Sequence, residues 1–322
     1  MTVVGGGRDA GRADNPLLAL ECRADGRVLR RELRPGRLGL RALDGVGRRR
    51  AQTLRNAGYD SREAVAAAEP SALAELPDVG RETAERIGES ARAVADGEIV
   101  RRSDAPLPDG DPVYVDIETD GLSPTITWLI GALDGADGSY RSFLQSDPED
   151  PGGAVEAFLS WYAAEARGRP IVAYNGWRFD FPVLRDHLLE YVPEYESVWT
   201  ATRRFDPYRW AVEEGNAVLP GRTNKLADVA GALGYERAEP GLTGAAVART
   251  YRQWIAVVSG TDPRERTAAE PDWERFERYC EDDVRALATV YEHLEASGRI
   301  VSKETDSRDP GESTVQGTLS EW

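Results

Sequence analysis

Two acidic residues that stand two positions apart, Asp116 and Glu118, offer the clearest chemistry in the sequence. Apolar and other residues alternate strictly from 113 to 118, which predicts a strand that carries both carboxylates on the same face. Two carboxylates this close repel each other unless a cation lies between them, and Mg²⁺ and Mn²⁺ prefer oxygen ligands. The pair indicates a metal site, although an isolated pair of this kind is more often a solvated strand face.

Two later segments carry a second set of candidate side chains. Asp180 follows an apolar strand and a glycine turn and begins a helix, where it either caps the helix or reaches into a cleft. The spacing of four residues places Tyr279 and Asp283 on one face of a helix expected over residues 273–293. Capping, surface acids and a half-buried tyrosine would each explain one segment taken alone.

Taken together and in this order, the segments DIET, YNGWRFDFP and YCEDD resemble the three exonuclease motifs of the DEDD superfamily. The resemblance spans residues 112–297 and is strongest to the 3′–5′ exonuclease domain of family B DNA polymerases and to related free-standing predicted exonucleases. It implies that the metal ligands are Asp116, Glu118, Asp180 and Asp283. Tyr279 stands in the YxxxD position of the tyrosine subclass, so the resemblance implies a catalytic role for it.

The resemblance also implies a mechanism with two ions, Mg²⁺ or Mn²⁺, that activate a water and stabilise the departing oxygen of a terminal phosphodiester. Asp116 is the best candidate to bridge both ions. A phenol is a poor base at neutral pH, so Tyr279 is expected to orient the water instead. Asn175 either binds substrate, braces Asp180 or stabilises a turn, whereas Asp206 is a weak candidate.

The elements that must position these residues follow from periodicity. The sequence predicts strands around 113–118, 127–133, 140–144 and 170–175, a helix near 153–166, and mostly helices up to about 297. This is an α/β domain, and the resemblance implies an RNase H-like mixed sheet flanked by helices over residues 112–297. Residues 96–111, rich in Pro, Gly and charge, are expected to form a linker.

Residues 38–95 contain an internal repeat in which LDGVGRRRAQTL recurs, at an offset of 33 residues, as LPDVGRETAERI. The pattern resembles a tandem helix-hairpin-helix unit, a small all-α domain that precedes the sheet domain. Such turns offer backbone N–H groups to a phosphate. The expected substrate-binding residues are Gly45, Gly47, Arg48, Gly80 and Arg81. A helical packing unit or a protein-docking module is the alternative.

The last residues form a separate candidate motif. Residues 298–315 have nothing to bury and are expected to be disordered. In QGTLSEW, Gln316, Leu319 and Trp322 recur at the period of a 3₁₀ helix, and the segment 316–322 resembles the sliding-clamp-interacting peptide of replication and repair proteins. A merely adhesive chain end is the alternative.

The amino-acid composition indicates the environment in which the protein is expected to work. The formal charge is −16, yet residues 1–102 carry 19 Arg against 16 acids, so the negative charge lies in the remainder. Two lysines among 40 basic residues, in so acidic a chain, are typical of a salt-loving organism. The two cysteines indicate a reduced cytoplasm, and no apolar run is long enough to span a membrane. Residues 1–37 suggest no role.

The expected function is therefore a metal-dependent 3′–5′ exonuclease that acts on nucleic acid, DNA in preference to RNA, in repair or replication and with the sliding clamp as a partner. Two alternatives stay open. One is a catalytically weak adaptor that binds nucleic acid and the clamp, and the other is an RNA-processing exoribonuclease.

Overall fold

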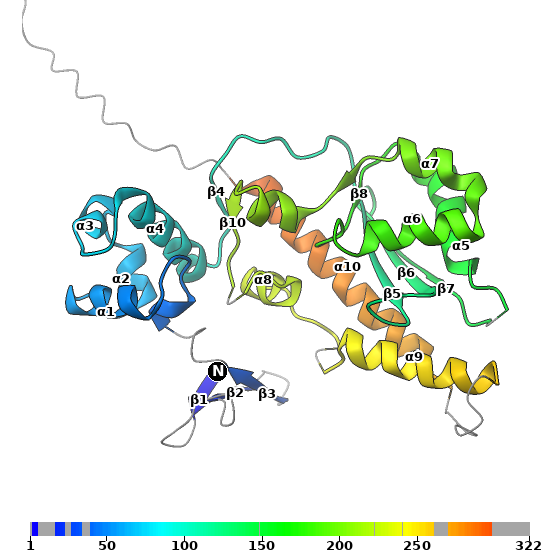
Figure 1. The fold of residues 1–322 in the computed structure, drawn as a ribbon, viewed down its shortest axis with the longest axis horizontal. Helices are drawn as coiled ribbons and strands as arrows, with labels where there is room; N and C mark the ends of the chain where they lie inside the picture. Colours follow the sequence, from blue (N-terminus) through cyan, green and yellow to red (C-terminus); the bar gives the residue numbers. More distant parts are fainter. Residues whose placement is uncertain are drawn as a thin grey trace, which may run out of the picture.

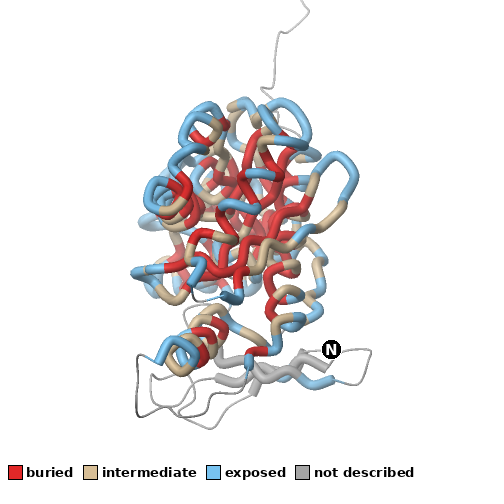
Figure 2. Tube along the Cα trace, turned by 90° about the vertical axis from the view of Figure 1, so that its right-hand side faces the viewer, coloured by how far each residue is buried: buried red, intermediate tan, exposed pale blue. Residues whose placement is uncertain are grey.

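The computed structural model describes residues 2–5, 17–22, 27–33, 39–147, 149–221, 223–239, 241–260 and 270–297. These residues form a small N-terminal sheet, a helical unit and a larger α/β body (Figure 1). Buried residues concentrate inside the α/β body, and a smaller buried group lies within the helical unit (Figure 2). The helical unit and the α/β body therefore each have a core of their own.

The N-terminal sheet has three antiparallel strands, β1 (Thr2–Gly5), β2 (Leu17–Cys22) and β3 (Val28–Leu33), in the order β1-β2-β3. The pairing of β2 with β3 extends from Leu17 opposite Leu33 to Cys22 opposite Val28. Sequence analysis assigned no element to residues 1–37, because short apolar runs separated by Gly, Arg and Asp carry no clear periodicity.

The helical unit confirms the predicted helix-hairpin-helix fold. It comprises η2 (Gly39–Ala42), α1 (Arg48–Asn56), α2 (Arg62–Ala66), α3 (Pro70–Ala74) and α4 (Arg81–Asp96). Equivalent positions of the repeat are buried in one core, including the small pair Ala51 and Ala84 and the larger pair Leu54 and Ile87. Both alanines are fully buried, so the two copies of the repeat contribute equivalent positions to this core.

The segment expected as a linker contains a strand. β4 (Val100–Arg101) pairs antiparallel with β10 (Ala217–Val218), a strand that lies far along the chain in the α/β body. The backbone N–H of Arg102 extends this pairing with a hydrogen bond to the carbonyl of Asn216 at 2.8 Å. The connection between the helical unit and the body is thus held by sheet hydrogen bonds.

The body is built on a five-stranded mixed sheet with the order β7-β6-β5-β8-β9. β5 (Val113–Thr119), β6 (Thr127–Asp134) and β7 (Tyr140–Leu144) form an antiparallel meander. β8 (Ile171–Val172) and β9 (Arg204–Phe205) continue the sheet in parallel with β5. This arrangement confirms the predicted RNase H-like fold class.

Helices cover both faces of this sheet. One face packs on α5 (Gly153–Trp161) and α6 (Asp180–Tyr191), and the odd-numbered apolar residues of β5 are buried there. The other face packs on the long helix α10 (Trp273–Ala296), which crosses the sheet diagonally in Figure 1. The shorter helical elements are η3 (Tyr162–Ala166), η4 (Pro193–Tyr195), α7 (Glu196–Ala201), η5 (Arg209–Glu213) and α8 (Leu226–Ala232).

An aromatic cluster anchors α9 (Gly244–Val258) beside the sheet. Tyr251 of α9 stacks on Trp128 of β6 with ring centroids 4.7 Å apart, and Trp254 meets Trp273 of α10 edge to face at 4.9 Å. Such pairs contribute about 0.5–1.5 kcal/mol beyond the burial of their area. Among the helices within the described ranges, none combines the length and apolar character of a membrane span.

Close packing of β6 against α10 generates a stability prediction. A Cβ atom at Gly131 would lie 2.6 Å from Cys280 Sγ, so Gly131→Ala should lower the free energy of unfolding by about 1–3 kcal/mol through overpacking. Gly231 of α8 has no atom near its own Cβ position, and Gly231→Ala should stabilise by roughly 0.5–1 kcal/mol. Urea unfolding of both variants checks this, and equal midpoints would contradict it.

Candidate active site

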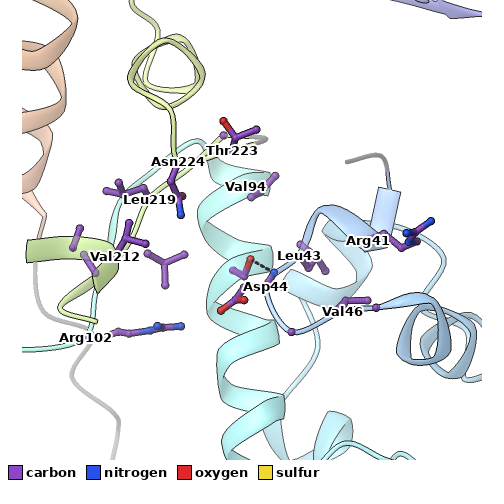
Figure 3. Close-up of a pocket in the computed structure, with 17 residues that line it drawn as sticks. Arg41, Leu43, Asp44, Val46, Val94, Arg102, Val212, Leu219, Thr223 and Asn224 are labelled. Carbon is purple, nitrogen blue, oxygen red and sulfur yellow. Dashed lines mark hydrogen bonds between the residues drawn. The ribbon is translucent and has the colours of Figure 1, made fainter. Parts of the chain in front are cut away.

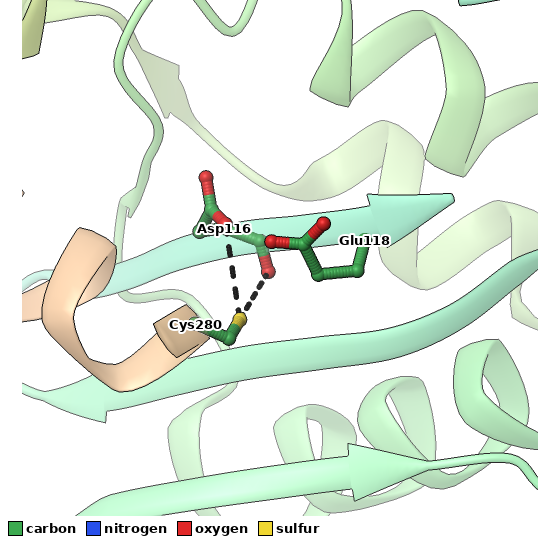
Figure 4. A group of neighbouring side chains, drawn as sticks. All are labelled: Asp116, Glu118 and Cys280. Atoms are coloured by element: carbon green, nitrogen blue, oxygen red, sulfur yellow. Dashed lines mark hydrogen bonds between the residues drawn. The ribbon is translucent and has the colours of Figure 1, made fainter. Parts of the chain in front are cut away.

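β5 places its two acidic side chains on the face that α10 covers, as the alternation predicted. Asp116 lies opposite Gly131 of β6, which has no side chain, and Cys280 of α10 fills the space above that glycine. The Cys280 Sγ atom lies 3.7 Å from the carbonyl oxygen of Asp116 and from its Oδ2 atom (Figure 4). Cys280 thus packs against the carboxylate pair, a role that sequence analysis missed.

α10 brings the third motif to the same place. Asp272 caps the helix by accepting a hydrogen bond from the backbone N–H of Arg275, and the turn from Tyr279 to Asp283 then faces β5. Tyr279 is buried, whereas Asp283 keeps partial access to solvent. The predicted i, i+4 relation between the tyrosine and the aspartate is therefore present in the structure.

Asp180 is the first residue of α6 and is buried, and the residue before it, Phe179, provides no side-chain cap. The preceding loop turns at Asn175, whose φ of 59° is in the left-handed region. Buried Asp206, at the end of β9, fixes this loop by accepting hydrogen bonds from the backbone N–H groups of Asn175 at 2.8 Å and Trp177 at 3.3 Å. Asp206 therefore positions the second motif from outside the carboxylate cluster.

The site is a hollow of about 690 Å³. Its floor is acidic, and its rim is formed by the loop after β5 and by small residues of α9. The lining side chains include Asp116, Glu118, Leu122, Gly244, Ala245, Ala248, Arg252, Tyr279 and Asp283. Leu122 is 93% exposed at this rim. Arg252 supports the loop by donating a hydrogen bond to the carbonyl oxygen of Asp120 at 2.5 Å.

The carboxylates repel one another. Burial raises the pKa of Asp116 and Glu118 well above their usual range, and the charges of Asp283 and the other carboxylates raise both further. Burial also raises the pKa of Asp180 to about 7, although backbone N–H groups act in the opposite direction. Charged forms of these groups therefore require positive charge in the site.

One source of positive charge is Arg237, in the loop between α8 and α9, which sequence analysis did not single out. Its Nη1 atom lies 2.7 Å from Oδ1 of Asp283, and its guanidinium carbon lies 5.2 Å from the centre of the Tyr279 ring. Burial raises the pKa of Asp283, and the ion pair with Arg237 lowers it. No motif marks Arg237, although the adjacent acids Asp282 and Asp283 could have signalled a cation nearby.

The donor set fits a hard divalent cation. Ligand atoms of Asp116, Glu118 and Cys280 lie within 4.8 Å of one another. Burial raises the pKa of the Cys280 thiol well above its usual range, so the sulfur stays protonated and is a poor ligand. Oxygen atoms of the carboxylates remain, and these are the ligands that Mg²⁺ and Mn²⁺ prefer.

A second hollow, of about 510 Å³, lies beside the loop that carries the second motif. Asn175 lines this hollow and not the acidic one, and Lys225 lines it too. Tyr174, which donates a hydrogen bond to the carbonyl oxygen of Asn224 at 2.8 Å, closes one side. Asn175 therefore lies next to the acidic site without joining it.

The first hairpin, Asp44–Gly47, faces a third hollow of about 500 Å³ between the helical unit and the α/β body. Figure 3 shows this hairpin and the segment 212–224 on either side of α4. Thr223 and Asn224 line both this hollow and the one beside Asn175. The hollow at the first hairpin and the hollow beside Asn175 are therefore adjacent.

The two hairpins differ in surroundings. Gly47 and Gly80 precede α1 and α4 without a side-chain cap, but only the first of these glycines lines the interdomain hollow. Arg50 joins the hairpins by donating to the carbonyl oxygens of Gly45 at 2.8 Å and Asp78 at 3.0 Å.

The two arginines predicted to bind substrate beside the hairpin glycines lie at the surface. Arg48 is exposed, and Arg81 is exposed and pairs with Glu85 at 3.5 Å.

The C-terminal candidates Gln316, Leu319 and Trp322 lie outside the described residues.

Comparison with solved structures gives partial matches to exonuclease I. The zinc-bound complex of E. coli exonuclease I with single-stranded DNA is 19% identical, with a TM-score of 0.32, over 49% of this chain and 42% of that chain. Exonuclease I without ligand is 17% identical, with a TM-score of 0.30, over 47% and 42%. In both comparisons the match spans less than half of the exonuclease I chain.

Comparison with protein-family models covers more of the chain. Residues 38–93 match the SAM-like helix-hairpin-helix tandem. Residues 113–295, more than half of the chain, match the RNase H superfamily and contain every strand of the five-stranded sheet. The chain therefore belongs to the RNase H superfamily.

Proposed function

We propose that the protein is a metal-dependent 3′–5′ exonuclease of the tyrosine DEDD type, acting on nucleic acid and on DNA in preference to RNA. The observation that carries this proposal is the meeting of Asp116 and Glu118 of β5 with Asp283 and Tyr279 of α10 in one acidic hollow, with Asp180 close enough to interact electrostatically. A site of pure mutual repulsion would be costly to maintain without a cation.

Each residue has a distinct task in this proposal. The four carboxylates would hold two Mg²⁺ or Mn²⁺ ions, which supply a water of lowered pKa and stabilise the departing oxygen. Burial raises the pKa of Tyr279 far above neutrality, so its phenol keeps its proton and acts as a hydrogen-bond donor that orients water or phosphate. Leu122 offers an exposed apolar surface beside the carboxylates, against which a terminal base can pack.

The substrate class follows from the hollows outside the acidic site. Among the described residues, the lining of the hollow beside Asn175 includes the cations Arg178 and Lys225 and the rings of Tyr174 and Tyr208, and none of these lining residues is acidic. Cations that follow a phosphate backbone, together with aromatic rings for stacking, are the usual features of single-strand binding. We infer that a strand passes from the acidic site over this hollow to the first hairpin, whose N–H groups bind phosphate.

The first prediction concerns the carboxylates. Asp283→Asn should reduce hydrolysis of end-labelled DNA by at least about a hundredfold, because a lost ligand removes charge stabilisation from the transition state. Asp116→Asn, Glu118→Gln and Asp180→Asn should behave alike, and Tyr279→Phe should lose less. The assay uses labelled DNA and RNA with Mg²⁺ or Mn²⁺ at high KCl concentration.

Glu281→Gln is the matched control for that assay, since Glu281 lies on α10 but pairs with Arg285 at 2.7 Å. It should keep wild-type activity. Full activity of Asp283→Asn would exclude this mechanism, and activity confined to RNA would favour the exoribonuclease alternative. Nucleic-acid binding without hydrolysis by the wild type would favour the adaptor alternative.

A second prediction separates the hairpins from the chemistry. No atom lies within 4 Å of a Cβ placed at Gly47 or Gly80, so valine at either position should fold normally while it covers the N–H groups. Gly47→Val should raise KM for long oligonucleotides several-fold and leave kcat for dinucleotides unchanged, with a smaller effect for Gly80→Val. Gly231→Val, at an exposed position of α8, serves as the control. Unchanged KM in both hairpin variants would assign the unit to packing or protein docking.

Recruitment by a sliding clamp is the third prediction, and it concerns Gln316, Leu319 and Trp322. A large aromatic anchor typically contributes at least ~2 kcal/mol to an interface. Trp322→Ala in the full chain should therefore weaken binding to the clamp of the same organism by roughly thirtyfold, with Leu319→Ala next and Ser320→Ala unchanged. Calorimetry measures these affinities. Absence of wild-type binding would remove the clamp from the proposal and leave the nuclease untouched.

A further inference from the structure

Arg237 lies inside the acidic site although no metal-ligand motif includes it. Its side chain is 18% exposed, and its Nη1 atom contacts Oδ1 of Asp283 at 2.7 Å. The guanidinium also lies over the Tyr279 ring, at 5.2 Å from the ring centre. A cation thus contacts the carboxylate that the proposed function assigns to a metal ion.

The loop that carries Arg237 is held to α10 by Asp282, the neighbour of the ligand. The Asp282 carboxylate accepts hydrogen bonds from the Tyr235 hydroxyl at 3.0 Å and from the backbone N–H groups of Ala238 at 2.9 Å and Glu239 at 2.7 Å. The two adjacent acids, Asp282 and Asp283, therefore have different roles. Asp282 holds the Tyr235 side chain and the backbone after Arg237. Its Oδ2 atom lies 4.0 Å from Arg237 Nε, whereas Asp283 makes the short contact with the guanidinium.

The contacts of the guanidinium are incomplete. Within the described part of the chain, the Nη2 atom of Arg237 is buried and has no hydrogen-bond partner. A buried N–H group without an acceptor costs about 1–3 kcal/mol, so an acceptor that binds there gains that energy. Arginine presents its donors as a planar fork that matches two oxygens of a phosphate group. The unused donor therefore points to an anionic oxygen ligand.

We propose that Arg237 is an exchangeable counter-cation: it neutralises Asp283 while the site lacks a divalent ion, and turns to a phosphate oxygen of the nucleic-acid end when such an ion binds Asp283. This inference rests on the proposed function. A divalent ion on Asp283 would lie close to the guanidinium and repel it, so metal binding weakens the ion pair. A phosphate then offers the displaced guanidinium a new partner.

This exchange couples two ligands. If phosphate receives the displaced guanidinium, then phosphate must raise the affinity for metal, and metal must raise the affinity for phosphate by the same factor. Arg237 would therefore limit metal loading of the free protein and favour it where a strand end is present. A residue that merely stabilised the loop would produce no such coupling.

The test measures Mn²⁺ binding to the full chain by calorimetry, with and without thymidine 5′-monophosphate as a phosphate probe that is not hydrolysed. In the wild type, the mononucleotide should tighten Mn²⁺ binding about fivefold or more. Arg237→Gln should bind Mn²⁺ alone roughly tenfold more tightly than the wild type, because a repelling charge is gone. The mononucleotide should change the Mn²⁺ affinity of this variant less than twofold.

Two further variants complete the design. Arg285→Gln removes a positive charge from α10, two residues after Asp283, where Arg285 pairs with Glu281 and does not line the acidic site. This variant should bind Mn²⁺ like the wild type. Arg237→Lys keeps the charge without the fork, so it should retain the weak Mn²⁺ binding and lose most of the coupling. Thermal melts establish that each variant is folded.

The outcomes separate the two proposals. Mn²⁺ affinity in Arg237→Gln equal to or weaker than that of the wild type would overturn the exchange while leaving the metal-dependent function intact. Wild-type protein that binds no Mn²⁺ would overturn the proposed function and this inference with it. Tighter Mn²⁺ binding in Arg237→Gln, with coupling lost, would support the exchange.

Discussion

Repulsion among carboxylates that are buried between β5 and α10 is the constraint on which the rest of this structure depends. Asp116 and Glu118 are fixed by a central strand, and Asp283 by a helix that packs along the whole sheet. Neither element can move to relieve the repulsion, because apolar packing on both sheet faces holds them. The fold thus maintains an unfavourable cluster of charge, which is the condition under which a cation binds strongly.

The surroundings of the cluster are arranged to support it. Gly131 leaves room for Cys280 below Asp116, so the strand and the helix approach closely. Asp206 fixes the loop before Asp180 through backbone N–H groups, and Asp282 fixes the loop that carries Arg237 in the same way. In both loops a buried carboxylate outside the cluster orients a residue within it, and hydrogen bonds to backbone make that orientation rigid.

Sequence alone predicted the parts of the site that depend on local periodicity. Alternation placed Asp116 and Glu118 on one strand face, and helical spacing placed Tyr279 above Asp283. The roles of Arg237 and Cys280 were not predicted, for different reasons. Arg237 lies in an irregular loop whose position is set by distant Asp282, and the importance of Cys280 appears only once Gly131 lies opposite it. The N-terminal strands were missed because their pairing, and not their pattern, defines them.

The pairing of β4 with β10 has a consequence for modular exchange. Because Val100 and Arg101 satisfy backbone groups of the α/β body, the hairpin unit and that body share a structural boundary inside a two-stranded sheet. A recombination event that joined a foreign hairpin unit downstream of β4 would remove the strand with which β10 pairs. When such units are exchanged between related chains, the junctions that persist should therefore lie upstream of Val100. A junction between the end of α4 and the start of β4 cuts no strand pair.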